Sequence, residues 1–151
     1  MRKNSLPKHI IVGLDGSESS IAALRHAADL AAKLHASLEA IMTWEYPVFY
    51  DPYYSGASWS PETETAKAMK AAIAQAFETD LPRNFTQTVL QGAPARVLIR
   101  ESEDATMLVL GSRGHGGFAG LLLGSVSATC AAHATCPVLI VHTHDSPGDS
   151  A

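Results

Sequence analysis

Short apolar runs alternate with helix-like segments along this chain, and this alternation is what most restricts its fold. The run His9–Leu14 is short, apolar and rich in β-branched residues, which predicts a buried strand. After it, Ile21, Leu24, Ala28 and Ala31 recur at helical spacing on one face. The same succession continues toward the end of the chain and gives the order β-α-β-α-β-α-β-α-β.

Five strands and four helices follow from these patterns. The predicted strands are His9–Leu14, Ser37–Trp44, Phe85–Leu90, Thr106–Leu110 and Pro137–His142. The predicted helices begin after a cap at Ser17 or Ser19, at Pro61 (running to about Thr79), at Pro94 and at about Val126 (running to Ala134). Strands separated by helices form a parallel sheet covered on both faces, and right-handed crossovers make it doubly wound. The expected fold class is therefore α/β and Rossmann-like.

Length and charge restrict the possible functions. The 151 residues suit one domain, predicted over residues 1–145, with a flexible tail at 146–151. The net charge of −4 argues against a nucleic-acid partner, because such proteins usually carry a basic face. No apolar run approaches the ~18 residues of a membrane span, and no signal-peptide pattern follows the basic start. A cytoplasmic protein without membrane contact is expected.

Two other segments have open interpretations. Cys130, His133 and Cys136 read Cys-x-x-His-x-x-Cys, but a tetrahedral metal site needs a fourth ligand, so two small buried thiols are the favoured interpretation. Residues 46–60 combine Pro47 and other turn formers with several aromatic side chains, which predicts a long surface loop. This loop is either a functional lid or an aromatic segment packing on its own domain or a partner.

A glycine-rich stretch after the fourth predicted strand carries the main site signal. Residues 111–127 hold six of the eleven glycines of the chain. Such a loop exposes backbone N–H groups, and a helix beginning near Ser125 or Ser127 adds more of them, which suits a phosphate. The stretch matches neither a Walker A loop nor a dinucleotide fingerprint. The alternative is a loop whose glycines serve only for turning.

Charge supports the phosphate interpretation. From Ala105 to His144 there is no Asp or Glu, and Arg113 is the only formal charge. A polyphosphate would meet little repulsion there and one guanidinium able to bind two oxygens. Ligands of doubly wound sheets lie outside the carboxyl ends of the strands, where the winding reverses. Residues after strands one and four are therefore expected to converge, which brings Asp15 toward the glycine-rich stretch.

The spacing Gly111-x2-Gly114-x9-Gly124-Ser125 resembles the nucleotide motif of ATP-binding universal stress proteins. Three further segments resemble that family, and together they extend the likeness over about residues 8–143: Ile11–Ser17, Gly92–Ala95 and Cys136–Val141. The resemblance implies the sheet order 3-2-1-4-5 and a homodimer that pairs through the fifth strand. An apolar edge strand agrees with such pairing.

The resemblance also implies ATP or a related adenine nucleotide as ligand, with Mg²⁺ or Mn²⁺. Asp15 would bond the ribose or help to hold the metal. Ile41 would lie against the adenine, with Leu14 and Leu110 near the base or ribose. Leu14 departs from the valine or small polar residue of many members. The phosphates and ribose would be reached by backbone or side-chain groups of Gly111, Arg113, Gly114, Gly124, Ser125, Val126 and Ser127.

Alternatives remain for single residues and for the function. Asp15 can be read as a helix cap, and Arg113 as a solvated loop charge. The expected function is an ATP-binding regulatory module of the stress response. A slow ATPase or autophosphorylating protein is the second hypothesis, and a nucleotide-free dimerisation or chaperone-like module is the third. One acid, one arginine and no lysine in the loop favour binding over phosphoryl transfer.

Overall fold

One parallel sheet organises the protein. The computed structural model describes residues 7–51, 53, 59–114 and 123–143. Its strands are β1 (His9–Leu14), β2 (Ser37–Trp44), β3 (Phe85–Gln91), β4 (Met107–Gly111) and β5 (Val138–Val141). They pair in the order β3-β2-β1-β4-β5, with every neighbouring pair parallel. The predicted fold class and strand order are confirmed.

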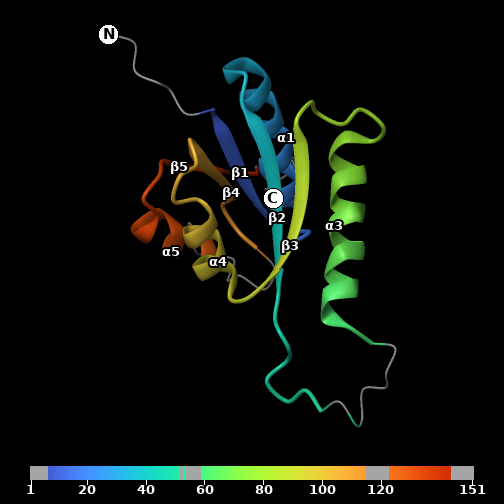
Figure 1. Cartoon of the computed structure of the whole chain (residues 1–151). Helices are drawn as coiled ribbons and strands as arrows, with labels where there is room; N and C mark the ends of the chain where they lie inside the picture. The colour runs from blue at the N-terminus through green and yellow to red at the C-terminus, as the bar shows by residue number, and fades with distance from the viewer. Residues whose placement is uncertain (1–6, 52, 54–58, 115–122, 144–151) are drawn as a thin grey trace, which may run out of the picture.

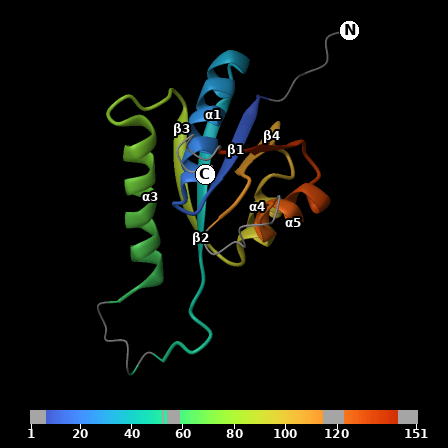
Figure 2. The same ribbon diagram turned by 180° about the vertical axis from the view of Figure 1, so that it is seen from behind.

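The two faces of the sheet are covered by two helices each. The helices are α1 (Glu18–Leu34), α3 (Pro61–Phe77), α4 (Pro94–Glu101) and α5 (Ser125–His133). Helices α1 and α3 pack together on one face, and α4 and α5 on the other (Figure 1; Figure 2). Because side chains alternate along a strand, neighbouring residues enter different cores. Ile10 and Val12 pack under α1, whereas Ile11 packs under α4 and α5.

Element boundaries differ slightly from the sequence prediction. Helix α3 ends at Phe77 rather than near Thr79, because Glu78 takes a left-handed φ of 54°. Strand β5 begins at Val138, since Pro137 has no N–H to donate to a ladder and contributes only its carbonyl, which accepts from Leu108. The predicted tail 146–151 lies outside the described residues. Within the described ranges, no helix is both long enough and apolar enough to cross a bilayer.

The sheet order places a switch point between β1 and β4. The chain leaves β1 toward β2 on the α1 face, and leaves β4 toward β5 on the α5 face. The connections after these two strands therefore diverge and leave a crevice at the carboxyl edge of the sheet. At the same edge, β2 continues into a segment that extends away from the sheet before α3 begins (Figure 1).

Candidate functional site

A cavity of about 710 Å³ occupies the carboxyl edge of the sheet. Its walls come from the ends of β1, β2 and β4, from the starts of α4 and α5, and from the first half of α3. All the site residues expected from the sequence line it: Leu14, Asp15, Ile41, Leu110, Gly111, Arg113, Gly114, Gly124, Ser125, Val126 and Ser127. Residues more than 100 positions apart in the chain thus converge on one space, and their individual contacts with a ligand stay predictions.

Asp15 is fixed by the turn that follows β1. Its Oδ1 accepts hydrogen bonds from the backbone N of Ser17 at 2.9 Å and from the Ser17 hydroxyl at 2.5 Å. Gly16 between them has φ 86°, a conformation that L side chains rarely adopt. The residue that caps α1 is Ser17, whose hydroxyl accepts from the N–H of Ser20. Asp15 is therefore a turn residue at the cavity and not the helix cap.

Gly114 lies directly against Asp15. A Cβ at position 114 would meet Oδ2 of Asp15, so this approach of the loop to the carboxylate requires glycine. Gly111 is equally confined, because a Cβ there would lie 2.6 Å from the carbonyl carbon of Ser19 in α1. The end of β4 and the start of α1 are therefore packed backbone to backbone, and Gly114 is brought to the carboxylate that follows β1.

Hydrogen bonds close the ends of the glycine-rich stretch. The carbonyl oxygen of Ser112 accepts from the N–H of Gly124 at 2.7 Å, and the buried hydroxyl of Ser127 lies 3.1 Å from the same oxygen. On the other side, the N–H of Arg113 donates to the Ser19 hydroxyl at 3.3 Å. These contacts hold the start of α5 beside the end of β4 and fix where its N-terminus opens.

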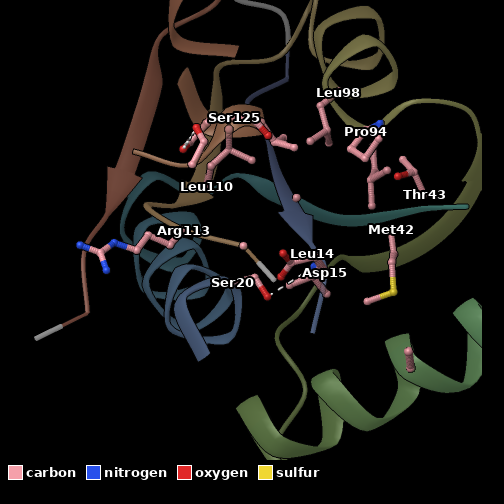
Figure 3. Close-up of a pocket in the computed structure, with 18 of the residues that line it drawn as sticks. Leu14, Asp15, Ser20, Met42, Thr43, Pro94, Leu98, Leu110, Arg113 and Ser125 are labelled. Atoms are coloured by element: carbon pink, nitrogen blue, oxygen red, sulfur yellow. Dashed lines mark hydrogen bonds between the residues drawn. The ribbon is translucent and has the colours of Figure 1, made fainter. Parts of the chain in front are cut away.

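The N-terminus of α5 is suited to an anion. Its cap residue is Gly124, which supplies no side-chain cap, and no acidic residue stands in the first turn. The first amide N–H groups of a helix have no partner within it and carry partial positive charge. The guanidinium of Arg113 extends away from Asp15 in Figure 3, and its role at a phosphate stays a prediction.

The sequence model of the Universal stress protein family matches residues 7–142. The chain belongs to the universal stress protein family. A curated universal stress protein of Mycolicibacterium smegmatis is 35% identical over 133 residues, which cover 87% of this chain and 45% of that protein. The chain thus spans less than half the length of that relative, so activities of the longer protein are not transferred to it.

Solved structures agree with the family and the fold. A universal stress protein from Lactobacillus plantarum superposes with a TM-score of 0.77 at 22% identity, covering 91% of this chain and 99% of that one. A universal stress protein in complex with cAMP is 34% identical with a TM-score of 0.58, covering 93% of this chain and 100% of that one. The Lactobacillus plantarum structure supports the fold alone, whereas the structure in complex with cAMP is also similar in sequence.

The cavity of this universal stress protein has walls that sequence reasoning did not assign. Gly13, Met42 and Thr43 line it beside predicted strand-end residues, so strand-end position alone could have found them. Pro94 and Leu98 line it from α4, a helix whose start the sequence predicted without assigning either residue to the site. Three more residues, Glu64, Thr65 and Ala68, come from α3, and no local pattern indicates them.

The two thiols of this universal stress protein are unbonded and partly or fully buried. Cys130 is buried on the core side of α5, and Cys136 packs against the same core. Burial, and then the neighbouring Cys136, raises the pKa of the Cys130 thiol from 9.0 to about 11. In the described part of the chain, no group of three or more His, Cys, Asp or Glu side chains is arranged to hold a metal. Cys130 is thus the buried thiol favoured from the sequence, whereas Cys136 is only partly buried.

Proposed function

We propose that this chain binds ATP, or a related adenine nucleotide, in the cavity and acts as a regulatory binding module of the stress response. The observation that carries the proposal is the meeting of Asp15, Gly114 and the α5 N-terminus in one space at the switch point. The relative solved with cAMP, 34% identical over nearly the whole chain, supports an adenine nucleotide as the ligand class.

The lining residues fit the parts of such a ligand. The phosphates would lie at the α5 N-terminus, where Gly124 leaves backbone N–H groups uncovered. The base and ribose would lie between Ile41, Leu14 and Leu110, each of which is buried and apolar. Asp15 would accept from a ribose hydroxyl or contact Mg²⁺ or Mn²⁺. Because the described residues hold no group of three or more His, Cys, Asp or Glu side chains arranged for a metal, phosphate oxygens and water would supply the remaining ligands.

Binding without fast turnover is part of the proposal. Phosphoryl transfer needs a metal clamp, an aligned nucleophile and cations on the transferring oxygens. Among the described residues that line the cavity, Arg113 is the sole cation and none is a lysine. We expect bound nucleotide to be recovered largely unhydrolysed. Steady phosphate release from a purified sample would contradict this part and favour the slow ATPase.

Homodimerisation through β5 and a cytoplasmic location complete the proposal. In the described chain, β5 pairs only with β4 and its four residues are partly exposed, which leaves an apolar edge able to pair with a second copy. Two free thiols agree with a reducing compartment. Sedimentation equilibrium is expected to give twice the chain mass, and a monomer mass would contradict the dimer.

The central experiment is titration of the purified chain with ATP in a calorimeter. Gly114→Val places a side chain against Asp15, in the space where the phosphates would lie at the α5 N-terminus. We therefore expect ATP affinity to fall at least about a hundredfold while the circular dichroism spectrum is retained. Ala128→Val is the matched control, because Ala128 is exposed on α5 and does not line the cavity. Unchanged affinity in Gly114→Val would refute the site.

A further inference from the structure

The cavity has two ends that differ in chemistry. At one end stand the backbone groups of Gly114 and Gly124 and the start of α5. At the other end, the first half of α3 faces the end of β2, and Glu64 and Thr65 line the wall there. Between them the walls are largely apolar. A nucleotide whose phosphates lie at α5 therefore directs its base toward α3.

Charge along the chain favours the same orientation. The stretch from Ala105 to His144, which supplies the α5 end, holds no Asp or Glu. At the α3 end, Glu64 is the one charged side chain among the described residues that line the cavity. In the described chain each end thus has one carboxylate, Asp15 at the first and Glu64 at the second, but only the first adds Arg113 and the N–H groups of the α5 N-terminus, which suit a phosphate. An uncharged base with hydrogen-bond donors is the part of a nucleotide that suits the α3 end.

Glu64 is the carboxylate of that end. Of the two acidic side chains that line the cavity in the described chain, Asp15 is bound by Ser17 and lies against Gly114 at the phosphate end. Glu64 pairs only loosely with Lys67, whose Nζ is 3.7 Å from Oε1, and both side chains are more than half exposed. Such an exposed pair is weak, so the carboxylate remains an available acceptor.

An ionised carboxylate accepts hydrogen bonds and donates none. The adenine base carries an amino group at position 6, a donor, whereas hypoxanthine and guanine carry a carbonyl oxygen there, which a carboxylate repels. Thr65 cannot reverse this preference easily, because its hydroxyl already donates to the carbonyl of Pro61 at 2.7 Å. We infer that Glu64 selects nucleotides whose base presents an amino group at this position, an inference that rests on the proposed nucleotide function.

The test compares ATP with inosine triphosphate, which replaces the 6-amino group by a carbonyl and keeps the ribose and phosphates. Affinities are measured by calorimetry for the wild type, for Glu64→Gln and for Glu62→Gln. Glu62 is the matched control, because it stands in the same first turn of α3, is exposed and does not line the cavity.

We expect the wild type to favour ATP about fivefold or more, a modest ratio because Glu64 is partly solvated. In Glu64→Gln the ratio falls to about one, since an amide can donate to the carbonyl of inosine as readily as it accepts from adenine. Glu62→Gln keeps the wild-type ratio.

Two outcomes overturn the inference without touching the proposed function: equal affinity of the wild type for both nucleotides, or an unchanged ratio in Glu64→Gln. If the wild type binds neither nucleotide, the proposed function fails as well, so the two failures are distinguishable.

Discussion

Two connections leave the carboxyl edge of the same sheet, and they are held in place by different means. The glycine-rich connection, residues 112–124, is closed by hydrogen bonds of Ser112 to Gly124 and Ser127. The aromatic connection, residues 45–60, is held by rings: Tyr46 and Tyr50 lie 4.9 Å apart between centroids, and Tyr50 and Trp59 lie 5.5 Å apart.

The difference shows which chemistry each connection can offer. At the described ends of the glycine-rich connection, these bonds fix the backbone of Ser112 and Gly124 beside the start of α5, which suits an anion bound by backbone N–H groups. The aromatic connection instead exposes side chains, with Phe49 96% and Val48 92% accessible to solvent. Contacts on such a surface are made by side chains and do not depend on fixed directions of backbone N–H groups. The following predictions test whether stability depends more on the described ends of the glycine-rich connection than on the exposed side chains of the aromatic one.

The largest contrast is expected between a substitution at the last residue of β4, directly before the glycine-rich connection, and one in the aromatic connection. Gly111→Ala at the start of the glycine-rich side places a Cβ 2.6 Å from backbone of Ser19, and the expected loss is about 2–3 kcal/mol of unfolding free energy. Phe49→Ala in the aromatic connection should change it by less than about 0.5 kcal/mol, because that ring is exposed. Urea unfolding measures both.

Gly124→Ala controls for the loss of glycine itself. A Cβ at position 124 has no neighbour closer than 3.4 Å, an ordinary contact, so the cost should stay well below that of Gly111→Ala. Equal costs at positions 111 and 124, or a large cost at Phe49, would contradict the contrast between the connections.

A smaller effect is expected from Ser127→Ala. The Ser127 hydroxyl is buried and lies 3.1 Å from the carbonyl oxygens of both Ser112 and Gly124, so its removal leaves a buried acceptor with one donor fewer. The expected cost is about 1–2 kcal/mol in urea unfolding. Thr129→Ala, an exposed hydroxyl on the same helix, serves as control and should cost much less. Similar losses in both variants would show that the closure of the connection is not rigid.

The smallest effect concerns Cys130, which is buried on the core side of α5. Its folded pKa of about 11 lies above 9.0, so the folded state keeps the proton longer than the unfolded state does. The stabilisation that comes from the buried, protonated thiol is fully present below about pH 9, and it is lost as pH rises toward 11. Between pH 7 and pH 10 the wild type should lose about 1 kcal/mol more stability than Cys130→Ala. If the unfolding free energies of the wild type and of Cys130→Ala fall equally with pH, the thiol is not held in the core.

The fold and one half of the site could be predicted from the sequence because their signals are local. Apolar runs mark the strands, and the spacing of Gly111, Gly114 and Gly124 marks a backbone cradle before a helix. The strand order then brings Asp15 to that cradle by topology alone. The sequence prediction of the convergence between the ends of β1 and β4 is confirmed by the cavity.

The other half could not be predicted, because it depends on tertiary packing. Glu64 and Thr65 line the cavity only because α3 packs beside α1 and continues past the edge of the sheet. Ser19 looks like a candidate helix cap in sequence, yet its buried hydroxyl accepts from Arg113, 94 positions away. Neither the helix docking nor this long-range bond leaves a periodic signal along the chain.

The bond from Gly124 to Ser112 has a consequence for observing the protein in solution. The backbone N of Gly124, the residue that caps α5, lies 2.7 Å from the carbonyl oxygen of Ser112, so the bond joins the two ends of the glycine-rich connection. Exchange of the amide proton of Gly124 with deuterium requires the hydrogen bond between Gly124 and Ser112 to break, while the strands of the sheet can stay paired. The amide resonance of Gly124 therefore reports the opening of this one hydrogen bond separately from global unfolding, and it does so without a substitution.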